Sequence, residues 1–220
     1  MAKIGMLTIG QSPREDLLPI LKPILGEGVE VLEAGALDGL TKKDVEAIQV
    51  SSDDYILVTR LRDGSEVKVT KRFVVPRMQE RLEELEARGV TLTVVMCTGR
   101  FPPFKSRGLV VTPSEALRGV VEACLKEGRL AVVYPTQEQT VHAEKEFSRP
   151  GVQVYADSVS PYTEGDVDGL VDRLRGFDPH LVFLNCFGFP LWLKERIKGE
   201  LGRPVLHSSS VVARIVKELI

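Results

Sequence analysis

Residues 3–16, KIGMLTIGQSPRED, join an apolar run to a turn and a helix start. Residues 4–9 are almost entirely apolar, which predicts a strand that is buried on both faces. Ser12, Pro13 and Glu15 follow in the pattern of an N-cap, a first helical residue and a capping-box partner. We therefore expect a strand, a tight turn and a helix that begins near Pro13.

The same order of elements returns in the second half of the chain. The repeat runs from residues 3–16 to RLAVVYPTQEQTVH (129–142), from VEVLEAGALDGLT (29–41) to VQVYADSVSPYT (152–163), from LTVVMCTG (92–99) to LVFLNCFG (181–188), and from GLVVTPSEALRGVV (108–121) to RPVLHSSSVVARIV (203–216). Apolar strands that alternate with helical patterns are typical of parallel sheets covered by helices. We predict an α/β protein with two pseudo-symmetric lobes.

One segment interrupts this alternation. Residues 55–73, YILVTRLRDGSEVKVTKRF, alternate in polarity, turn at Asp63-Gly64 and alternate again. That pattern predicts a β-hairpin. We expect it to be an insertion within residues 53–73, largely outside the lobes, where it either covers a cleft or makes a homo-oligomer contact.

Without the hairpin, the two halves of the repeat have comparable lengths. The predicted N-terminal lobe spans residues 1–112 and carries the hairpin. The predicted C-terminal lobe spans residues 113–208. We expect the last helix, residues 209–220, to pack back on the first lobe.

The overall composition limits the classes of partner. The chain has 220 residues, with 29 Lys plus Arg against 31 Asp plus Glu and a formal charge of −2. This balance gives no electrostatic reason to expect a nucleic-acid partner. No apolar run approaches the roughly 20 residues of a membrane span, and the first ten residues predict a strand rather than a signal peptide. We expect a cytoplasmic protein without a membrane partner.

Three cysteines, Cys97, Cys124 and Cys186, are widely spaced and form no CxxC or Cys/His cluster. The pattern predicts no metal site and no disulfide framework. We also expect no cofactor, because the chain has neither a dinucleotide-binding fingerprint nor a Walker motif. Cys124 shares a predicted helix face with Leu117 and Val121, which indicates a packing residue.

Cys97 and Cys186 occupy equivalent positions of the repeat, each at the carboxyl end of an apolar strand. Ligands of parallel α/β sheets bind outside the carboxyl ends of the strands. If the lobes face each other there, one thiolate can remove a proton from carbon while the opposite thiol returns one. That chemistry requires one thiol pKa to fall below about 8.5. Taken singly, each cysteine is more often a buried core residue.

The opening IGMLTIGQSPRED, the segments MCTG and NCFGF and the chain length resemble the AroM family. AroM proteins in turn resemble the aspartate/glutamate/hydantoin racemase superfamily, whose members have two pseudo-symmetric α/β lobes and one cysteine in each. The resemblance implies that Cys97 and Cys186 are the catalytic thiols, and that Thr98 helps to hold a substrate carboxylate.

The sequence also departs from that superfamily. Racemases often read Cys-Asn-Thr at the first site, whereas this chain reads Cys-Thr-Gly. Amino-acid racemases often have Thr-His after the second cysteine, where this chain has Phe187-Gly188. The segment NCFG is nearer to the hydantoin racemase pattern.

Further residues fall at the ends of predicted strands or at helix starts, where they can contact a small polar ligand. Each also has a structural explanation: helix caps for the hydroxyls, loop hydrogen bonds for Gln11, and solvation or ion pairing for the arginines. The candidate ligand-binding residues besides Thr98 are Gln11, Ser12, Arg100, Thr136, Gln137, Asn185 and His207, with Arg14 as a second cation that can attract an anion.

We predict a cofactor-independent racemase- or isomerase-like protein that acts on a small carboxylate or a related compound by proton transfer between two cysteines. One cysteine can instead be a nucleophile, as in a cysteine-dependent isomerase or decarboxylase. The alternatives are a non-catalytic protein that binds or senses a small anion, and a scaffold whose cleft is only an interface.

Overall fold

The computed structural model describes residues 2–51 and 54–220. The chain folds into two compact units, which are described one at a time. Unit 1 comprises Met1–Ser114 and Ala213–Ile220, and unit 2 comprises Glu115–Val212.

The elements of the first half are β1 (Ala2–Thr8), α1 (Leu18–Leu25), β2 (Val29–Gly35), α2 (Lys42–Glu46), β3 (Ile56–Arg60), β4 (Glu66–Thr70), α3 (Lys71–Ala87), β5 (Leu92–Val95) and β6 (Leu109–Val111). Those that follow are α4 (Pro113–Cys124), β7 (Gly128–Tyr134), α5 (Gln137–Thr140), α6 (Ala143–Phe147), β8 (Val152–Ser158), α7 (Val167–Phe177), β9 (Leu181–Leu184), α8 (Leu191–Leu201), β10 (Val205–His207) and α9 (Ser208–Glu218).

Each unit is built on one parallel sheet, and the two sheets have the same topology. The strand order is β2-β1-β5-β6 in unit 1 and β8-β7-β9-β10 in unit 2. In both units the first strand of the repeat is central, and the cysteine-bearing strand pairs beside it. The predicted fold class, two pseudo-symmetric lobes with helix-covered parallel sheets and a hairpin, is confirmed.

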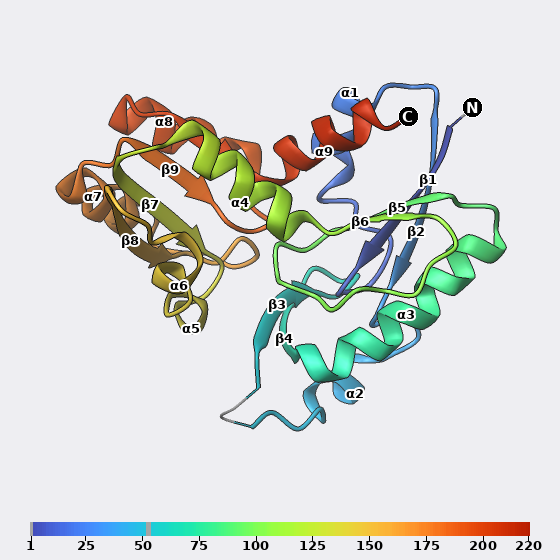
Figure 1. Ribbon diagram of the computed structural model, residues 1–220. Coiled ribbons are helices and arrows are strands. Elements are labelled where there is room, and N and C mark those ends of the chain that lie inside the picture. The colour runs from blue at the N-terminus through green and yellow to red at the C-terminus, as the bar shows by residue number, and fades with distance from the viewer. Residues whose placement is uncertain (1, 52–53) are drawn as a thin grey trace. The chain divides into compact units, whose positions relative to one another are not determined.

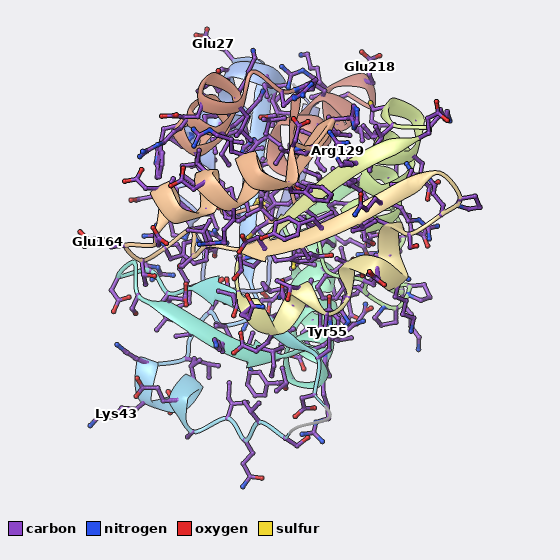
Figure 2. All side chains as sticks on the ribbon, turned by 90° about the vertical axis from the view of Figure 1, so that its left-hand side faces the viewer. Glu27, Lys43, Tyr55, Arg129, Glu164 and Glu218 are labelled. Carbon is purple, nitrogen blue, oxygen red and sulfur yellow. The ribbon has the colours of Figure 1, made fainter. Side chains whose placement is uncertain are left out.

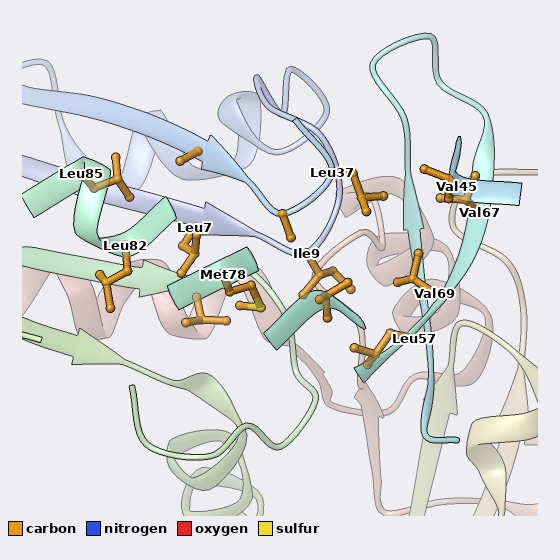
Figure 3. Packing of buried hydrophobic residues seen from close by; sticks show 14 of the residues in the cluster. Leu7, Ile9, Leu37, Val45, Leu57, Val67, Val69, Met78, Leu82 and Leu85 are labelled. Atoms are coloured by element: carbon orange, nitrogen blue, oxygen red, sulfur yellow. The ribbon is translucent and has the colours of Figure 1, made fainter. Parts of the chain in front are cut away.

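The core of unit 1 forms between its sheet and α3. Leu7 points from the sheet toward Met78, Leu82 and Leu85 of the helix (Figure 3). Val95 of the sheet belongs to the same cluster, and all five side chains are fully buried. The strands are buried on their other face too, where Figure 1 shows α1 and the end of α9. Burial on both faces explains the nearly continuous apolar sequence of β1.

Unit 2 repeats this three-layer arrangement. One face of its sheet contributes Val133 and Leu184 to a core that includes Leu174 of α7 and Ile197 of α8. On the other face, Phe183 packs edge-on against Phe147 of α6, with ring centroids 5.7 Å apart.

Figure 2 shows charged side chains such as Glu27, Lys43 and Glu164 pointing away from the ribbon. Within the described residues, no helix has the length and apolarity needed to cross a membrane.

The predicted hairpin is formed by the antiparallel strands β3 and β4, with its turn at Asp63-Gly64. Asp53, at its predicted start, lies outside the described residues. The expectation that the hairpin lies largely outside the lobe was wrong. Its alternating apolar side chains, including Leu57 and Val69, are buried in the core of unit 1.

The predicted start of the first helix was also wrong, because α1 begins at Leu18 and not near Pro13. The backbone N–H groups of Ser12 and Arg14 are occupied by side chains from elsewhere in unit 1. Ser12 donates to Asp38 at 2.8 Å, and Arg14 donates to Glu33 at 2.7 Å. These carboxylates hold the segment as a loop before the helix starts.

Candidate functional site

Cys97 and Cys186 lie in turns that share one geometry. Each follows the strand beside the central strand, β5 for Cys97 and β9 for Cys186. In each turn the sulfur accepts the backbone N–H of the glycine two residues later, Gly99 or Gly188, at 3.4 Å. The residue before each cysteine donates its N–H to the central strand, at 2.8 Å in both units. The repeat thus places both thiols in the same local structure, which we call the thiol turn.

Cys97 is half-buried against the core of unit 1. Burial raises the pKa of its thiol to about 11, and the N–H groups of Gly99 and Thr98 only partly oppose that shift. The charges of Arg14 and Lys71 also act to lower this pKa. Cys97 is therefore a neutral thiol at neutral pH, and the thiolate that two-base chemistry requires does not lie here in the resting protein.

Arg14 is a cation that acts on this thiol. Its side chain is only 3% exposed and donates two hydrogen bonds to the carboxylate of Asp16, at 2.9 and 2.7 Å. A further hydrogen bond of 3.0 Å reaches the hydroxyl of Thr8, at the end of β1. Burial alone would raise the pKa of Asp16, but Arg14 holds it below its ordinary value. Arg14 is thus ion-paired as predicted, and it is buried.

Lys71 is a second such cation, and it was not predicted from the sequence. It is the first residue of α3 and follows the hairpin directly. Its ammonium lies 5.3 Å from the ring centroid of Tyr55 and 5.9 Å from that of Phe101. Burial lowers the pKa of Lys71, opposed by the charge of Cys97, while Arg100 lowers it further. Lys71 thus lies in the electrostatic environment of the first thiol turn.

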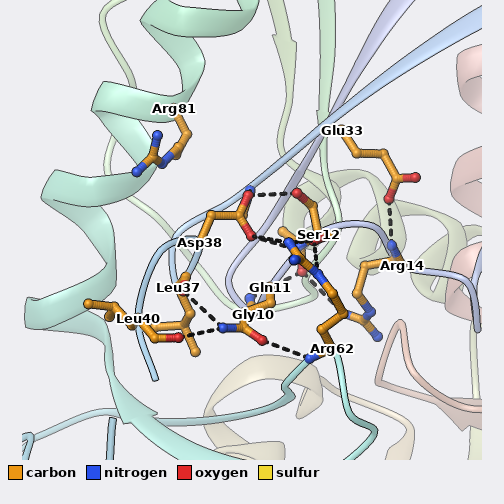
Figure 4. Close-up of polar contacts among 12 residues, drawn as sticks. Gly10, Gln11, Ser12, Arg14, Glu33, Leu37, Asp38, Leu40, Arg62 and Arg81 are labelled. Atoms are coloured by element: carbon orange, nitrogen blue, oxygen red, sulfur yellow. Dashed lines mark hydrogen bonds and ion pairs between the residues drawn. The ribbon is translucent and has the colours of Figure 1, made fainter. Parts of the chain in front are cut away.

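Gln11 joins three segments of unit 1 (Figure 4). Its side-chain amide donates to the carbonyls of Leu37 and Leu40, at 3.3 and 2.7 Å. Its side-chain oxygen accepts the backbone N–H of Arg62 at 2.8 Å. These bonds connect the loop after β1 to the loop after β2 and to the hairpin. They account for a long amide at this position, while contact with a ligand stays a prediction.

Asp38 is a second residue that the sequence analysis missed. Its carboxylate accepts the hydroxyl of Ser12 at 2.6 Å, the backbone N–H of Ser12 at 2.8 Å and that of Gly35 at 2.8 Å (Figure 4). The guanidinium of Arg62 lies 3.9 Å from the same carboxylate and donates to the carbonyl of Ser12 at 2.9 Å. Ser12 is therefore a loop-holding residue in this geometry, and its predicted role toward a ligand stays untested.

Replacing Gln11 with alanine should lower the free energy of unfolding by about 1 to 3 kcal/mol, because backbone groups in the loops lose their partners. Urea denaturation gives the measurement. Gln137→Ala is the matched control at the equivalent position of unit 2, where the exposed amide accepts the hydroxyl of Ser158 at 3.1 Å and donates to the hydroxyl of Thr140 at 3.3 Å, with no backbone partner among the described residues. Equal stability of the two variants would contradict the loop-holding role.

Cys186 is buried in the core of unit 2, beside Phe189 and Leu193. Tyr162 closes one side of its turn, since a Cβ on Gly188 would lie 2.2 Å from the tyrosine hydroxyl. A pocket of about 520 Å³ opens next to this tyrosine. The residues that line it are Val159, Ser160, Pro161, Tyr162, Thr163, Glu164, Gly165, Val167, Pro190, Trp192 and Leu193.

His207 holds the second thiol turn in place. The ring is 1% exposed, and Nε2 lies 2.7 Å from the carbonyl of Phe189. Because a carbonyl only accepts, Nε2 carries the proton and Nδ1 accepts from Ser210 at 2.8 Å. Burial lowers the pKa of His207, which favours the neutral ring. Both nitrogens are occupied, so the predicted contact of His207 with a ligand stays a prediction.

The lowered pKa of His207 predicts a pH-dependent stability. As the pH falls below the unfolded-state value of about 6.5, the unfolded chain takes up a proton at His207 before the folded chain does. The free energy of unfolding should therefore fall between about pH 7 and pH 5. We expect His207→Gln to show a shallower slope in urea denaturation across this range than the unsubstituted protein. Parallel slopes in the two proteins would rule this out.

The sequence matches a known protein family. A family model described as AroM protein matches residues 4–220. The chain belongs to the AroM family. No curated protein matches the sequence.

Solved structures with the AroM chain's fold include several enzymes. Unliganded arylmalonate decarboxylase has 14% identity and a TM-score of 0.57, covering 100% of this chain and 92% of that chain. Picrophilus torridus aspartate racemase has 9% identity and a TM-score of 0.61, covering 100% and 94%. The maleate isomerase Iso from Pseudomonas putida S16 has 15% identity and a TM-score of 0.56, covering 99% and 91%. At these identities the likeness shows the fold.

The remaining candidates of the AroM chain lie near the ends of strands. Thr98 and Asn185 flank the two cysteines, and Asn185 is buried. Thr136 precedes the four-residue helix α5 without capping it by a side-chain bond, and its hydroxyl contacts Glu138. In the part of the chain that the structure describes, no group of three His, Cys, Asp or Glu side chains could hold a metal ion.

The interpretation of Cys124 as a buried packing residue was wrong. Cys124 is exposed, although Leu117 and Val121 are buried as predicted. Helix α4 ends at Cys124, and the following Leu125 takes the buried position. Cys124 is therefore open to alkylation in the folded AroM chain, and labelling studies need a Cys124→Ser background.

Proposed function

We propose that this AroM protein is a cofactor-independent racemase- or isomerase-like enzyme that moves a proton on an acidic carbon of a small carboxylate. The observation that carries the proposal is the repeated thiol turn. Two cysteines, 89 positions apart in the repeat, have the same strand position and the same Sγ contact with a glycine N–H at 3.4 Å. Core packing alone gives no reason for the contact to recur.

The proposed reaction uses one thiol and one thiolate on one ligand. The thiolate takes a proton from the acidic carbon, leaving a carbanion that an adjacent carboxyl or carbonyl group delocalises. The thiol then donates its proton to the opposite face of that carbon, so that the two sulfurs exchange protonation states. The raised pKa of Cys97 supports its role as the proton donor in the resting enzyme, and the proposal then assigns the role of base to Cys186.

The names of the structural relatives support the substrate class. They include an aspartate racemase, an allantoin racemase, a maleate isomerase and an arylmalonate decarboxylase. Aspartate, maleate and arylmalonates are small carboxylates, and allantoin is a compound with an acidic carbon–hydrogen bond.

The cysteines of the described residues form no disulfide, which supports a reducing, cytoplasmic location for the protein.

The test is hydrogen–deuterium exchange at carbon. The purified protein is incubated in deuterated water with aspartate, glutamate, allantoin and phenylmalonate in turn, and proton NMR follows the acidic C–H signal. We expect the signal of at least one compound to disappear faster than in the Cys97→Ser/Cys186→Ser double variant. Identical rates with both proteins for every compound would contradict the proposed activity on this substrate class.

The second candidate is a binding protein that uses the same site without catalysis. The neutral state of Cys97 and the burial of Cys186 favour it, because neither supplies an exposed thiolate. Thermal unfolding separates the candidates. A melting temperature that rises with malonate, with no exchange at carbon for any compound, would favour binding alone.

A further inference from the structure

We propose that Lys71 binds the carboxylate of the ligand at the Cys97 thiol turn. This inference rests on the proposed function, since it names the residue that holds the small carboxylate. Lys71 is the first residue after the hairpin.

Two aromatic rings, those of Tyr55 and Phe101, lie beside the ammonium of Lys71, and one of them connects it with the thiol turn. Phe101, whose ring centroid lies 5.9 Å from the ammonium, also packs on the turn itself. A Cβ built on Gly99 would lie 3.6 Å from the Phe101 ring and 3.5 Å from the sulfur of Cys97. One ring therefore contacts the lysine and the glycine that donates to the sulfur.

The charge of Lys71 has no carboxylate partner among the described residues. Its ammonium makes no ion pair and no hydrogen bond there, and its contacts are the faces of Tyr55 and Phe101. Arg14, by contrast, is bound by both carboxylate oxygens of Asp16. Partial burial makes an ammonium costly, and an incoming anion offsets that cost. Within the described residues, Lys71 is thus a cation near this thiol whose charge no carboxylate neutralises.

The position of Lys71 in its helix strengthens its preference for an anion. It is the first residue of α3, a helix of 17 residues whose N-terminus carries partial positive charge. A single ammonium beside two aromatic rings suits one small, planar anionic group. A carboxylate attached to an acidic carbon would then hold that carbon near the sulfur of Cys97.

Two alkylating reagents of similar size test the inference without a known substrate. Iodoacetate carries a carboxylate and iodoacetamide does not, while both form the same S–CH₂ bond with release of iodide. Both require the same thiolate, so the ratio of their rates at one pH does not depend on the thiol pKa. The rates are measured in Cys124→Ser protein by mass spectrometry of the peptide that contains Cys97.

We expect Lys71→Met to lower the iodoacetate-to-iodoacetamide ratio about fivefold or more, and Lys71→Arg to keep most of it. Lys68→Met is the matched control, because this exposed lysine lies on β4 of the same hairpin. In protein that retains Lys71, added salt should slow iodoacetate more than iodoacetamide and so lower the ratio, a readout that requires no variant to fold.

An unchanged ratio in folded Lys71→Met, or a ratio that falls equally in Lys68→Met, would overturn the inference. If Lys71→Met does not fold, a wild-type ratio that is insensitive to salt would overturn it. These outcomes are separate from the failure of the proposed activity, which appears as absent exchange at carbon. A lowered ratio without such exchange would keep Lys71 as an anion-binding residue in a non-catalytic protein.

Discussion

Replacing Cys97 or Cys186 with serine should reduce the exchange of a substrate's acidic hydrogen with solvent by about 100- to 10,000-fold. That range is typical for the loss of a general acid or base. A serine hydroxyl keeps the size of the side chain but neither gives nor takes a proton readily near neutral pH. The measurement is the loss of the C–H signal in deuterated water, with the compound that the wild-type protein exchanges fastest.

Cys124→Ser is the matched control, because Cys124 is exposed at the end of α4 and has no counterpart in the repeat. We expect this variant to keep the full exchange rate. If either single variant at Cys97 or Cys186 also keeps it, that cysteine is a packing residue.

Replacing Gly10 with alanine should lower the free energy of unfolding by about 3 kcal/mol, which is the upper part of the range for overpacking. A Cβ at this position would lie 2.3 Å from the hydroxyl oxygen of Thr59 and 2.6 Å from the carbonyl oxygen of Arg60. Both atoms belong to β3, so the hairpin would have to move away from the end of β1. Urea denaturation measures the effect.

Gly119→Ala gives the matched comparison within α4. A Cβ there meets no atom within 4 Å, and alanine is the better helix former. We expect this variant to gain about 0.5 to 1 kcal/mol. Two variants with equal stability would show that the hairpin does not pack against Gly10 as described.

The sequence predicted the fold well because the repeat and the apolar strands are local patterns. Residues 4–9 predicted β1, and the segments around both cysteines predicted β5 and β9. The start of α1 was missed because long-range contacts override a local capping pattern. The carboxylates of Asp38 and Glu33 accept the backbone N–H groups of Ser12 and Arg14. In a helix that began near Pro13, the capping residues of the helix itself would have been the partners at this end.

The candidate site could be predicted only in part, for the same reason. The repeat located Cys97 and Cys186, since equivalent positions in the sequence become equivalent turns. Lys71 was missed because its neighbours Tyr55 and Phe101 are far away in the sequence and meet only when the hairpin packs on unit 1.

The burial that sets a pKa likewise depends on tertiary packing. Strand position suggested that one thiol would be activated, whereas desolvation makes Cys97 a poor acid. Cys124 was predicted to be buried and is exposed. Helical periodicity predicts which face of a helix is apolar, but not the residue at which the helix ends.

The central claim is that Cys97 and Cys186 act on one small ligand. The most direct measurement is the reaction of folded Cys124→Ser protein with 1,3-dichloroacetone, a short reagent that bridges two thiols when both can reach it. Peptide mapping by mass spectrometry then identifies the products. The account predicts a bridge between Cys97 and Cys186 within one chain, formed more slowly when the fastest-exchanging compound is present. Single adducts without any bridge, under conditions where both cysteines react, would contradict it.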